Sequence, residues 1–404
     1  MSEQPKLEVA DIIRAHGDEY RRWRGGKLSS EEEYVLRSLA ACRTAVLGGH
    51  LEECGECGHR RPAYNSCRNR HCPKCQGARR AAWLDARRAE LLPVPYFHVV
   101  FTLPDRLSPL ALQNKGLLYN LLFRATAETL QEVAATAKHL GAEIGFLAIL
   151  HTWGQNLLDH PHLHCVVPGG GLSPDGSRWI ACRKEDFFLP VRVLSAVFRG
   201  KFLDGLKRAF QQGKLALYGR LAELASPEAF QRLVAECYRL KWVVYAKPPF
   251  GGPEQVLKYL ARYTHRVAIS NSRLISLKDG RVTFRWKNYA DGNGQQTMPL
   301  DAVEFLRRFL LHLLPSHFVR IRHYGLLANR HRAKKLARCR ELLGQVACEA
   351  PAEPPAPRPA DEEPLEEQPS KSCPLCGGRM HTVQQRPRLS GRELRALPWP
   401  WDTS

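Results

Sequence analysis

The chain has 404 residues, of which 60 are lysine or arginine and 40 are aspartate or glutamate, so its formal net charge at pH 7 is +20. Such an excess of positive charge favours a polyanionic partner such as nucleic acid. No apolar run reaches membrane-spanning length, and the opening residues MSEQPKLEV lack the apolar centre of a signal peptide. We therefore expect a cytoplasmic protein whose 13 cysteines are reduced thiols.

Residues 1–93 are expected to form an N-terminal domain, with a helical lead-in followed by two Cys-x-x-Cys pairs. Each pair supplies two thiolates from one tight turn, as in a four-cysteine zinc ribbon. The pattern predicts one structural Zn²⁺ bound by Cys54, Cys57, Cys72 and Cys75. Four nearby side chains remain alternative ligands or the basis of a second site: His50, His59, Cys67 and His71.

Arginines flank these cysteines and continue into a basic helix expected around residues 78–92, which ends at Pro93. Arginine side chains bind phosphate oxygens and release counterions from DNA. We expect the following residues to contact DNA: Arg68, Arg70, Arg79 and Arg80. A second basic run, from Arg320 to Arg340, could line a channel for single strands or form a solvated helix face.

Residues 94–348 are expected to form a second domain in which strands and helices alternate irregularly. Strands are predicted at 97–103, 145–153, 160–167 and 242–248, and helices at 110–140, 195–241, 254–266 and 301–315. A hairpin is predicted around Lys278-Asp279-Gly280. This order of elements indicates an α+β fold built on an antiparallel sheet.

A histidine pair lies in the strand that Pro168 and three glycines terminate. Residues two apart on a strand point the same way, so His162 and His164 share one face while Leu163 packs behind them. Two imidazoles aimed at one point can bind a divalent metal and leave positions open for phosphate oxygens. A polar strand face without metal is the alternative interpretation.

Two tyrosines lie four residues apart on the helix predicted over residues 254–266. Tyr259 and Tyr263 therefore share one helix face, and either hydroxyl could attack the same phosphate. Arg262 and Arg266 would contact the backbone or the developing charge. The alternative is that the two rings are amphipathic side chains at the edge of a core.

The amino-acid composition changes in the C-terminal part of the chain. Residues 349–372 are rich in proline and glutamate and are expected to form a linker. Residues 373–404 form a tail with one more Cys-x-x-Cys pair, Cys373 and Cys376, which is half a zinc ribbon. Its partners could be His381 with Cys339 or Cys348, or the pair could bind no metal.

Four sequence blocks occur in an order that resembles the His-hydrophobic-His (HUH) tyrosine transposases of rolling-circle insertion sequences, the two-tyrosine type with an N-terminal zinc-binding domain. The blocks are CRNRHCPKCQ from Cys67, YFHVVFTLP from Tyr96, HPHLHCVVPGGGL from His160 and YLARYTHRVAIS from Tyr259. The resemblance implies a palm-like antiparallel sheet with inserted helices, a catalytic Mg²⁺ or Mn²⁺ held by His162, His164 and a third ligand, and a tyrosine nucleophile. His151 is the preferred third ligand, with Gln155 next and His160 after it.

The function expected from these features is that of a transposase. It would cleave and rejoin single-stranded DNA at mobile-element ends through a covalent 5′-phosphotyrosine at Tyr259 or Tyr263. An HUH replication initiator or relaxase of a plasmid or phage is one alternative, since it uses the same chemistry at a single origin. A zinc-containing DNA-binding protein without catalysis is another, but it leaves the histidines and tyrosines unexplained. A carboxylate-triad transposase is disfavoured, because no suitable set of acidic residues occurs between the cysteines and residue 330.

Overall fold

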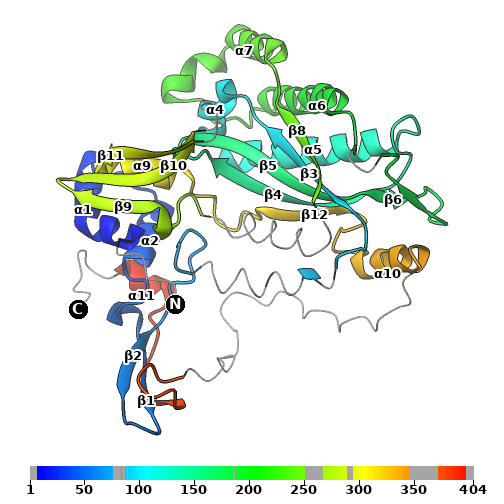
Figure 1. Ribbon diagram of the computed structural model, residues 1–404. Coiled ribbons are helices and arrows are strands. Elements are labelled where there is room, and N and C mark those ends of the chain that lie inside the picture. Colours follow the sequence, from blue (N-terminus) through cyan, green and yellow to red (C-terminus); the bar gives the residue numbers. More distant parts are fainter. Residues whose placement is uncertain are drawn as a thin grey trace. The chain divides into compact units, whose positions relative to one another are not determined.

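A computed structural model describes residues 7–75, 83, 87–88, 90–184, 187–250, 267–288, 294–344 and 372–396 (Figure 1). The chain divides into two compact units, and each is built from segments that are distant in sequence. Unit 1 comprises Met1–Ala78, Ile269–Leu313 and Pro351–Ser404, and unit 2 comprises Arg79–Ala268 and Leu314–Ala350.

Unit 1 combines helices with two three-stranded antiparallel sheets. The sheets have the strand orders β13-β1-β2 and β11-β10-β9. The strands are β1 (Gly49–Cys54), β2 (Arg60–Tyr64), β9 (Leu274–Lys278), β10 (Arg281–Asn288), β11 (Gly294–Asp301) and β13 (Met380–Arg386). The helices are α1 (Val9–Trp23), α2 (Ser30–Ala40), α9 (Ala302–Leu311) and α11 (Gly391–Ala396), with 3₁₀ turns at Ala45–Leu47 and Asn271–Arg273.

Local sequence signals account for the ends of several of these elements. At the start of α2 the Ser29 hydroxyl accepts a hydrogen bond from the Glu32 backbone N–H, and the Glu32 carboxylate accepts one from the Ser29 N–H, which is a capping box. Between β9 and β10 both Asp279 and Gly280 adopt positive φ, of 48° and 69°. Residues that tolerate positive φ at two successive positions allow the tight hairpin turn that the sequence predicts.

The β9–β11 sheet belongs to unit 1 and not to the catalytic domain expected over residues 94–348. Helix α9, which follows this sheet, packs against α1 near the N-terminus. The Asn271 side chain also accepts a hydrogen bond from the Val9 backbone N–H at 3.2 Å. The expected boundaries missed this arrangement because neither contact leaves a periodic signal in the sequence.

Unit 2 is built around a five-stranded antiparallel sheet with the order β12-β4-β5-β3-β8. Its strands are β3 (Tyr96–Thr102), β4 (Gly145–Trp153), β5 (Asp159–Pro168), β8 (Val244–Phe250) and β12 (Ile321–Gly325), and β6 (Gly170–Leu172) pairs with β7 (Trp179–Ala181). The helices are α4 (Ser108–Gln113), α5 (Lys115–Ala135), α6 (Val191–Gln211), α7 (Pro227–Arg239) and α10 (Arg332–Leu342), with 3₁₀ turns at Asp105–Leu107 and Gly219–Ala225.

The two faces of the five-stranded sheet differ in character. Alternate residues such as Phe101, Leu150 and Leu163 join side chains of α5 and α6 in one large apolar core. The intervening residues therefore point to the opposite face. That face carries a small apolar cluster around Leu147 and Val166, and it also carries the histidines.

The α+β class with an antiparallel sheet is confirmed, and most strands in unit 2 lie where the sequence predicts them. β4 covers the predicted residues 145–153, and β5 contains the histidine pair. β12 falls within the second basic run and was not anticipated, since its side chains are only half-buried and show no alternation. No helix in the described part of the chain combines the length and apolar composition needed to cross a membrane.

Candidate metal centres

Three histidines meet on the face of the sheet that points away from α5 and α6. His151 on β4 lies directly opposite His162 on β5, and His164 lies two residues further along β5. One ligand nitrogen from each ring lies within 4.8 Å of the others. His151 and His164 are 2% and 7% exposed, and His162 is partly exposed. We call these three residues the histidine cluster; Leu163 packs behind them in the apolar core, as predicted.

The ring nitrogens of the cluster are oriented by hydrogen bonds. His162 Nδ1 lies 2.6 Å from the carbonyl oxygen of His160, which can only accept, so Nδ1 carries the proton and Nε2 presents its lone pair. The Nε2 atoms of His162 and His164 are 3.1 Å apart. Two nitrogens bound to one ion at about 2.0–2.1 Å would be separated by about 3.0–3.4 Å. The spacing therefore fits a shared metal ion.

A fourth histidine, which the sequence had not singled out, lies beside the cluster. His98 on β3 is 3% exposed, and its Nε2 is 2.8 Å from Nδ1 of His164. Burial, with smaller effects from Lys247 and His162, lowers the pKa of His98 to about 3, so this imidazole is neutral. When the Nδ1–H of His164 donates a hydrogen bond to His98, the Nε2 atom of His164 presents its lone pair to the cluster and can bind a cation. The sequence feature that could have pointed to His98 is that it is a single histidine in an otherwise apolar strand.

The other two residues weighed as third ligand lie outside the cluster. His160 points toward Asp105, with 3.6 Å between His160 Nδ1 and the Asp105 carboxylate. Gln155 lies in the turn between β4 and β5. The geometry therefore favours His151 among the three candidates.

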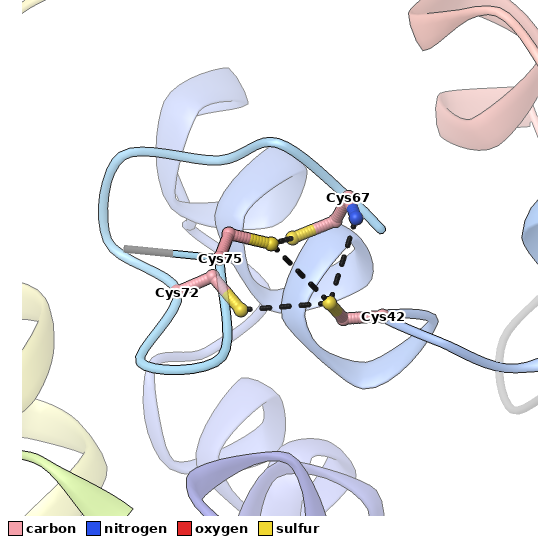
Figure 2. A group of neighbouring side chains, drawn as sticks. All are labelled: Cys42, Cys67, Cys72 and Cys75. Carbon is pink, nitrogen blue, oxygen red and sulfur yellow. Dashed lines mark hydrogen bonds between the residues drawn. The ribbon is translucent and has the colours of Figure 1, made fainter. Parts of the chain in front are cut away.

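Four cysteines of unit 1 form a buried group that we call the core cluster: Cys42, Cys67, Cys72 and Cys75. Figure 2 shows their sulfurs turned toward one another, with Cys42 Sγ 3.5 Å from Cys75 Sγ and 3.6 Å from Cys72 Sγ. These separations are too long for disulfides, and they approach the sulfur spacing of about 3.8 Å expected for a tetrahedral ion with bonds of about 2.3 Å. Hydrogen bonds from the other three thiols lower the pKa of Cys75. Hydrogen bonds with Cys42 and Cys75 raise the pKa of Cys67 and Cys72. Without a cation the four thiols therefore cannot all ionise.

The structure corrects the predicted ligand set of Cys54, Cys57, Cys72 and Cys75. Cys72 and Cys75 lie in the core cluster with Cys42 and Cys67, whereas Cys54 and Cys57 lie elsewhere, with Cys373 and Cys376. The prediction was wrong because sequence spacing alone cannot show that Cys42, at the end of α2, completes the first group. Cys67 had been noted as an alternative ligand, but Cys42 had not.

Several predicted residues lie outside the part of the chain that the structure describes, namely Tyr259, Tyr263, Arg262, Arg266, Arg79 and Arg80. Arg68 is exposed, with φ of 53°, and Arg70 is half-buried. In the second basic run, Arg332 pairs with Glu90 at 3.2 Å, and Lys335 contacts Glu143. Part of that run is therefore neutralised within unit 2.

Comparison with known proteins identifies the relatives of this chain. Residues 145–335 match the family described as "Putative transposase", and residues 12–103 match the family described as "Transposase zinc-binding domain". The chain is 56% identical over 400 residues to a putative transposase, y4qJ, of Sinorhizobium fredii, with 98% of each chain covered. It is 32% identical to the transposase for insertion sequence element IS801 of Pseudomonas savastanoi pv. phaseolicola, with 88% of this chain and 84% of that protein covered.

These matches show that the chain belongs to the transposases of the IS91/IS801 type and carries their zinc-binding domain. The resemblance to rolling-circle HUH transposases is thereby confirmed, and the protein is an enzyme that acts on DNA. Among solved structures, the conjugative relaxase TrwC in complex with oriT DNA aligns with a TM-score of 0.25 and 16% identity, over 62% of this chain and 73% of that chain. A likeness at that level supports no conclusion about the site.

Proposed function

We propose that the protein nicks and rejoins single-stranded DNA at the ends of its mobile element, using a tyrosine nucleophile and a divalent ion bound by His151, His162 and His164. The observation that carries this proposal is the histidine cluster, in which three ligand nitrogens converge within 4.8 Å on one sheet face. A divalent ion bound there would act as a Lewis acid on the oxygens of the scissile phosphate. An all-nitrogen donor set favours Mn²⁺ over Mg²⁺, because Mg²⁺ prefers oxygen ligands.

The tyrosine segment can reach this cluster. The described part of unit 2 is interrupted between Phe250 and Val267, and Phe250 pairs with Tyr96, which itself pairs with Pro168 of β5. Pro168 and His162 are separated by about 20 Å of strand, at about 3.4 Å per residue. A helix over residues 254–266, as the sequence predicts, would span about 20 Å. Either Tyr259 or Tyr263 could then lie over the histidines.

In the proposed reaction a tyrosine oxygen attacks the phosphorus and loses its proton. The bond between phosphorus and the 3′ oxygen breaks, the 3′ oxygen takes up a proton, and the 5′ phosphate remains bonded to the tyrosine. Rejoining is the reverse attack by a 3′ hydroxyl, which needs no external energy because the phosphotyrosine preserves the bond energy. Arg262 and Arg266 are proposed to contact the phosphate and to favour ionisation of a hydroxyl whose ordinary pKa is about 10.

The core cluster is proposed to hold a structural Zn²⁺ that organises the N-terminal part of unit 1 for DNA binding. Its four sulfurs are buried and have the soft donor chemistry that zinc prefers. Exposed Arg68 lies next to Cys67 in this segment, so the metal would hold a DNA-contacting residue in place. This assignment replaces the ligand set predicted from spacing.

A covalent-adduct assay tests the tyrosine mechanism. Labelled single-stranded oligonucleotides carrying the element ends are incubated with protein and Mn²⁺, and adducts are resolved by denaturing electrophoresis and mapped by peptide analysis. We expect an adduct on Tyr259 or Tyr263 that disappears in the double Phe variant. Tyr245→Phe is the matched control, because Tyr245 is 50% exposed on a strand of the same sheet. An adduct that persists in the double variant, or cleavage that leaves a free 5′ phosphate, would refute the mechanism.

A further inference from the structure

The C-terminal Cys-x-x-Cys pair meets its counterpart near the start of the chain. Cys376 Sγ lies 3.4 Å from Cys54 Sγ, and Cys373 Sγ lies 3.6 Å from Cys57 Sγ. These partners are 322 and 316 residues apart in sequence. Cys54 and Cys373 are buried, whereas Cys57 and Cys376 are exposed. We call these four residues the clasp cluster.

The two turns of the clasp cluster have matching backbone hydrogen bonds. The N–H of Cys54 donates to the carbonyl of His59, and the N–H of Cys373 donates to the carbonyl of Gly378, five residues on in each case. Within the same turns the N–H of Gly58 donates to Cys54, and the N–H of Gly377 donates to Cys373. Both glycines have positive φ, of 67° and 77°.

Matching backbone geometry in two distant segments means that each turn presents its two sulfurs in the same way. In the tail, backbone N–H groups also point at sulfur, from Leu375 to Cys373 Sγ at 3.5 Å and from Gly378 to Cys376 Sγ at 3.4 Å. Such N–H donors stabilise thiolates that are bound to a cation. Two turns facing each other supply four thiolates, which is a complete set for tetrahedral zinc.

The segments around the two turns pair and pack closely against each other. β1 leads into the first turn and β13 leaves the second, and the two strands pair antiparallel, with Cys54 opposite Met380. A Cβ on Gly378 would lie 2.5 Å from the Glu56 side chain and 3.1 Å from Cys54 Sγ. Further along the tail, Arg388 donates a hydrogen bond to the carbonyl of Cys67, in the core cluster.

From this geometry we infer that Cys54, Cys57, Cys373 and Cys376 bind a second Zn²⁺, which joins the C-terminal tail to the N-terminal zinc-binding domain. The matched zinc-binding family covers residues 12–103 and so contains only half of this ligand set. The sulfur separations exceed the disulfide length of about 2.0 Å and lie near the spacing of a tetrahedral zinc site. The tail is thus a structural part of unit 1, and His381, Cys339 and Cys348 are not needed as ligands. The inference does not depend on the cleavage chemistry.

Zinc analysis of the full chain tests the inference. We expect two zinc ions per chain in the wild type and one in either double variant, Cys54→Ser with Cys57→Ser or Cys373→Ser with Cys376→Ser. Because both pairs would bind the same ion, the quadruple variant should also retain one. Cys339→Ser, which removes a buried cysteine of unit 2, is the control and should keep two.

Two further measurements separate loss of metal from loss of folding. Cys376→His keeps a zinc ligand at an exposed position and should restore two ions per chain. A protease site inserted in the proline-rich segment 351–369 allows the tail to be cut from the otherwise intact protein. The tail should then co-elute with the rest of the chain until a chelator is added. Two zinc ions retained in the Cys373/Cys376 double variant, or a tail that separates before chelation, would overturn the inference.

Discussion

The Nε2 atom of His98 lies 2.8 Å from the Nδ1 atom of His164, and the two rings are stacked with an interplanar angle of 11°. The hydrogen bond carries one proton, and its position decides whether the Nε2 atom of His164 presents a lone pair or an N–H to His162. With the proton on His164 Nδ1, the lone pair of His164 Nε2 points into the histidine cluster. A neutral His98 accepts this hydrogen bond through the lone pair of its Nε2 atom while the proton stays on His164, so we expect His98 to be a positioning residue for His164.

The first prediction follows from this contact. His98→Leu removes the acceptor and should weaken Mn²⁺ binding by about 10- to 100-fold, whereas His98→Gln supplies a carbonyl oxygen and should retain most of the affinity. Titration calorimetry with Mn²⁺ on purified protein measures the effect without DNA. His323→Leu is the control, since burial lowers the pKa of this histidine to about 3 as well, and it lies on β12 outside the cluster. Equal affinities for wild type and His98→Leu would rule out the positioning role.

The second prediction concerns the ligands and the identity of the ion. His151→Ala, His162→Ala or His164→Ala should abolish cleavage while DNA affinity stays within a few-fold, because backbone contacts come mainly from basic side chains. Nitrogen ligands favour transition metals, so Mn²⁺ should support cleavage at lower concentration than Mg²⁺. Cleavage rates measured across a metal series, alongside filter-binding affinities, check both statements. Normal cleavage by a ligand variant, or full activity in excess chelator, would contradict them.

The third prediction separates the core cluster from the ligand set that the sequence suggested. Cys42→Ser and Cys67→Ser should each lose one zinc and unfold the N-terminal part of unit 1, because structural zinc binding is coupled to folding. Circular dichroism and zinc analysis before and after chelation provide the readout. Cys165→Ser serves as the comparison, as Cys165 lies buried in the apolar core of unit 2. A Cys42→Ser protein with full zinc content would exclude Cys42 as a ligand.

The fourth prediction concerns the pH dependence of stability. Burial raises the pKa of Asp159, at the start of β5, to about 7. The folded state then retains a proton that the unfolded state has lost, so this residue's contribution to stability is present below about pH 4 and is lost as the pH rises toward 7. Asp159→Asn should therefore stabilise the protein by about 2–4 kcal/mol at pH 8 and have little effect near pH 4, at about 1.4 kcal/mol per pKa unit.

Thermal unfolding of the Asp159→Asn variant at several pH values measures this effect. Asp105→Asn is the matched control, because the Asp105 side chain is 87% exposed and lies near the same end of the strand. If the two variants show the same pH profile, burial of Asp159 does not contribute to the pH dependence.

Local sequence patterns were enough to predict most of the helices and strands and the common face of two histidines. Apolar runs defined β4 and β5, and the period of two in a strand necessarily places His162 and His164 on one face. The turn residues Asp279 and Gly280 predicted the hairpin, because few residues tolerate the backbone angles that it requires. Charge and motif order indicated a transposase, which the relatives confirm.

Tertiary structure decided which distant residues meet, because packing, and not the spacing of residues along the sequence, determines which segments lie close together in space. Pairing of β3 with β5 brought His98 to His164, and pairing of β1 with β13 brought the tail cysteines to Cys54 and Cys57. The sequence left the grouping of the cysteines open because a Cys-x-x-Cys pair constrains only its own turn. It carries no information on which other cysteines lie beside that turn; the strand register and helix α2, which ends beside Cys42, decide this grouping.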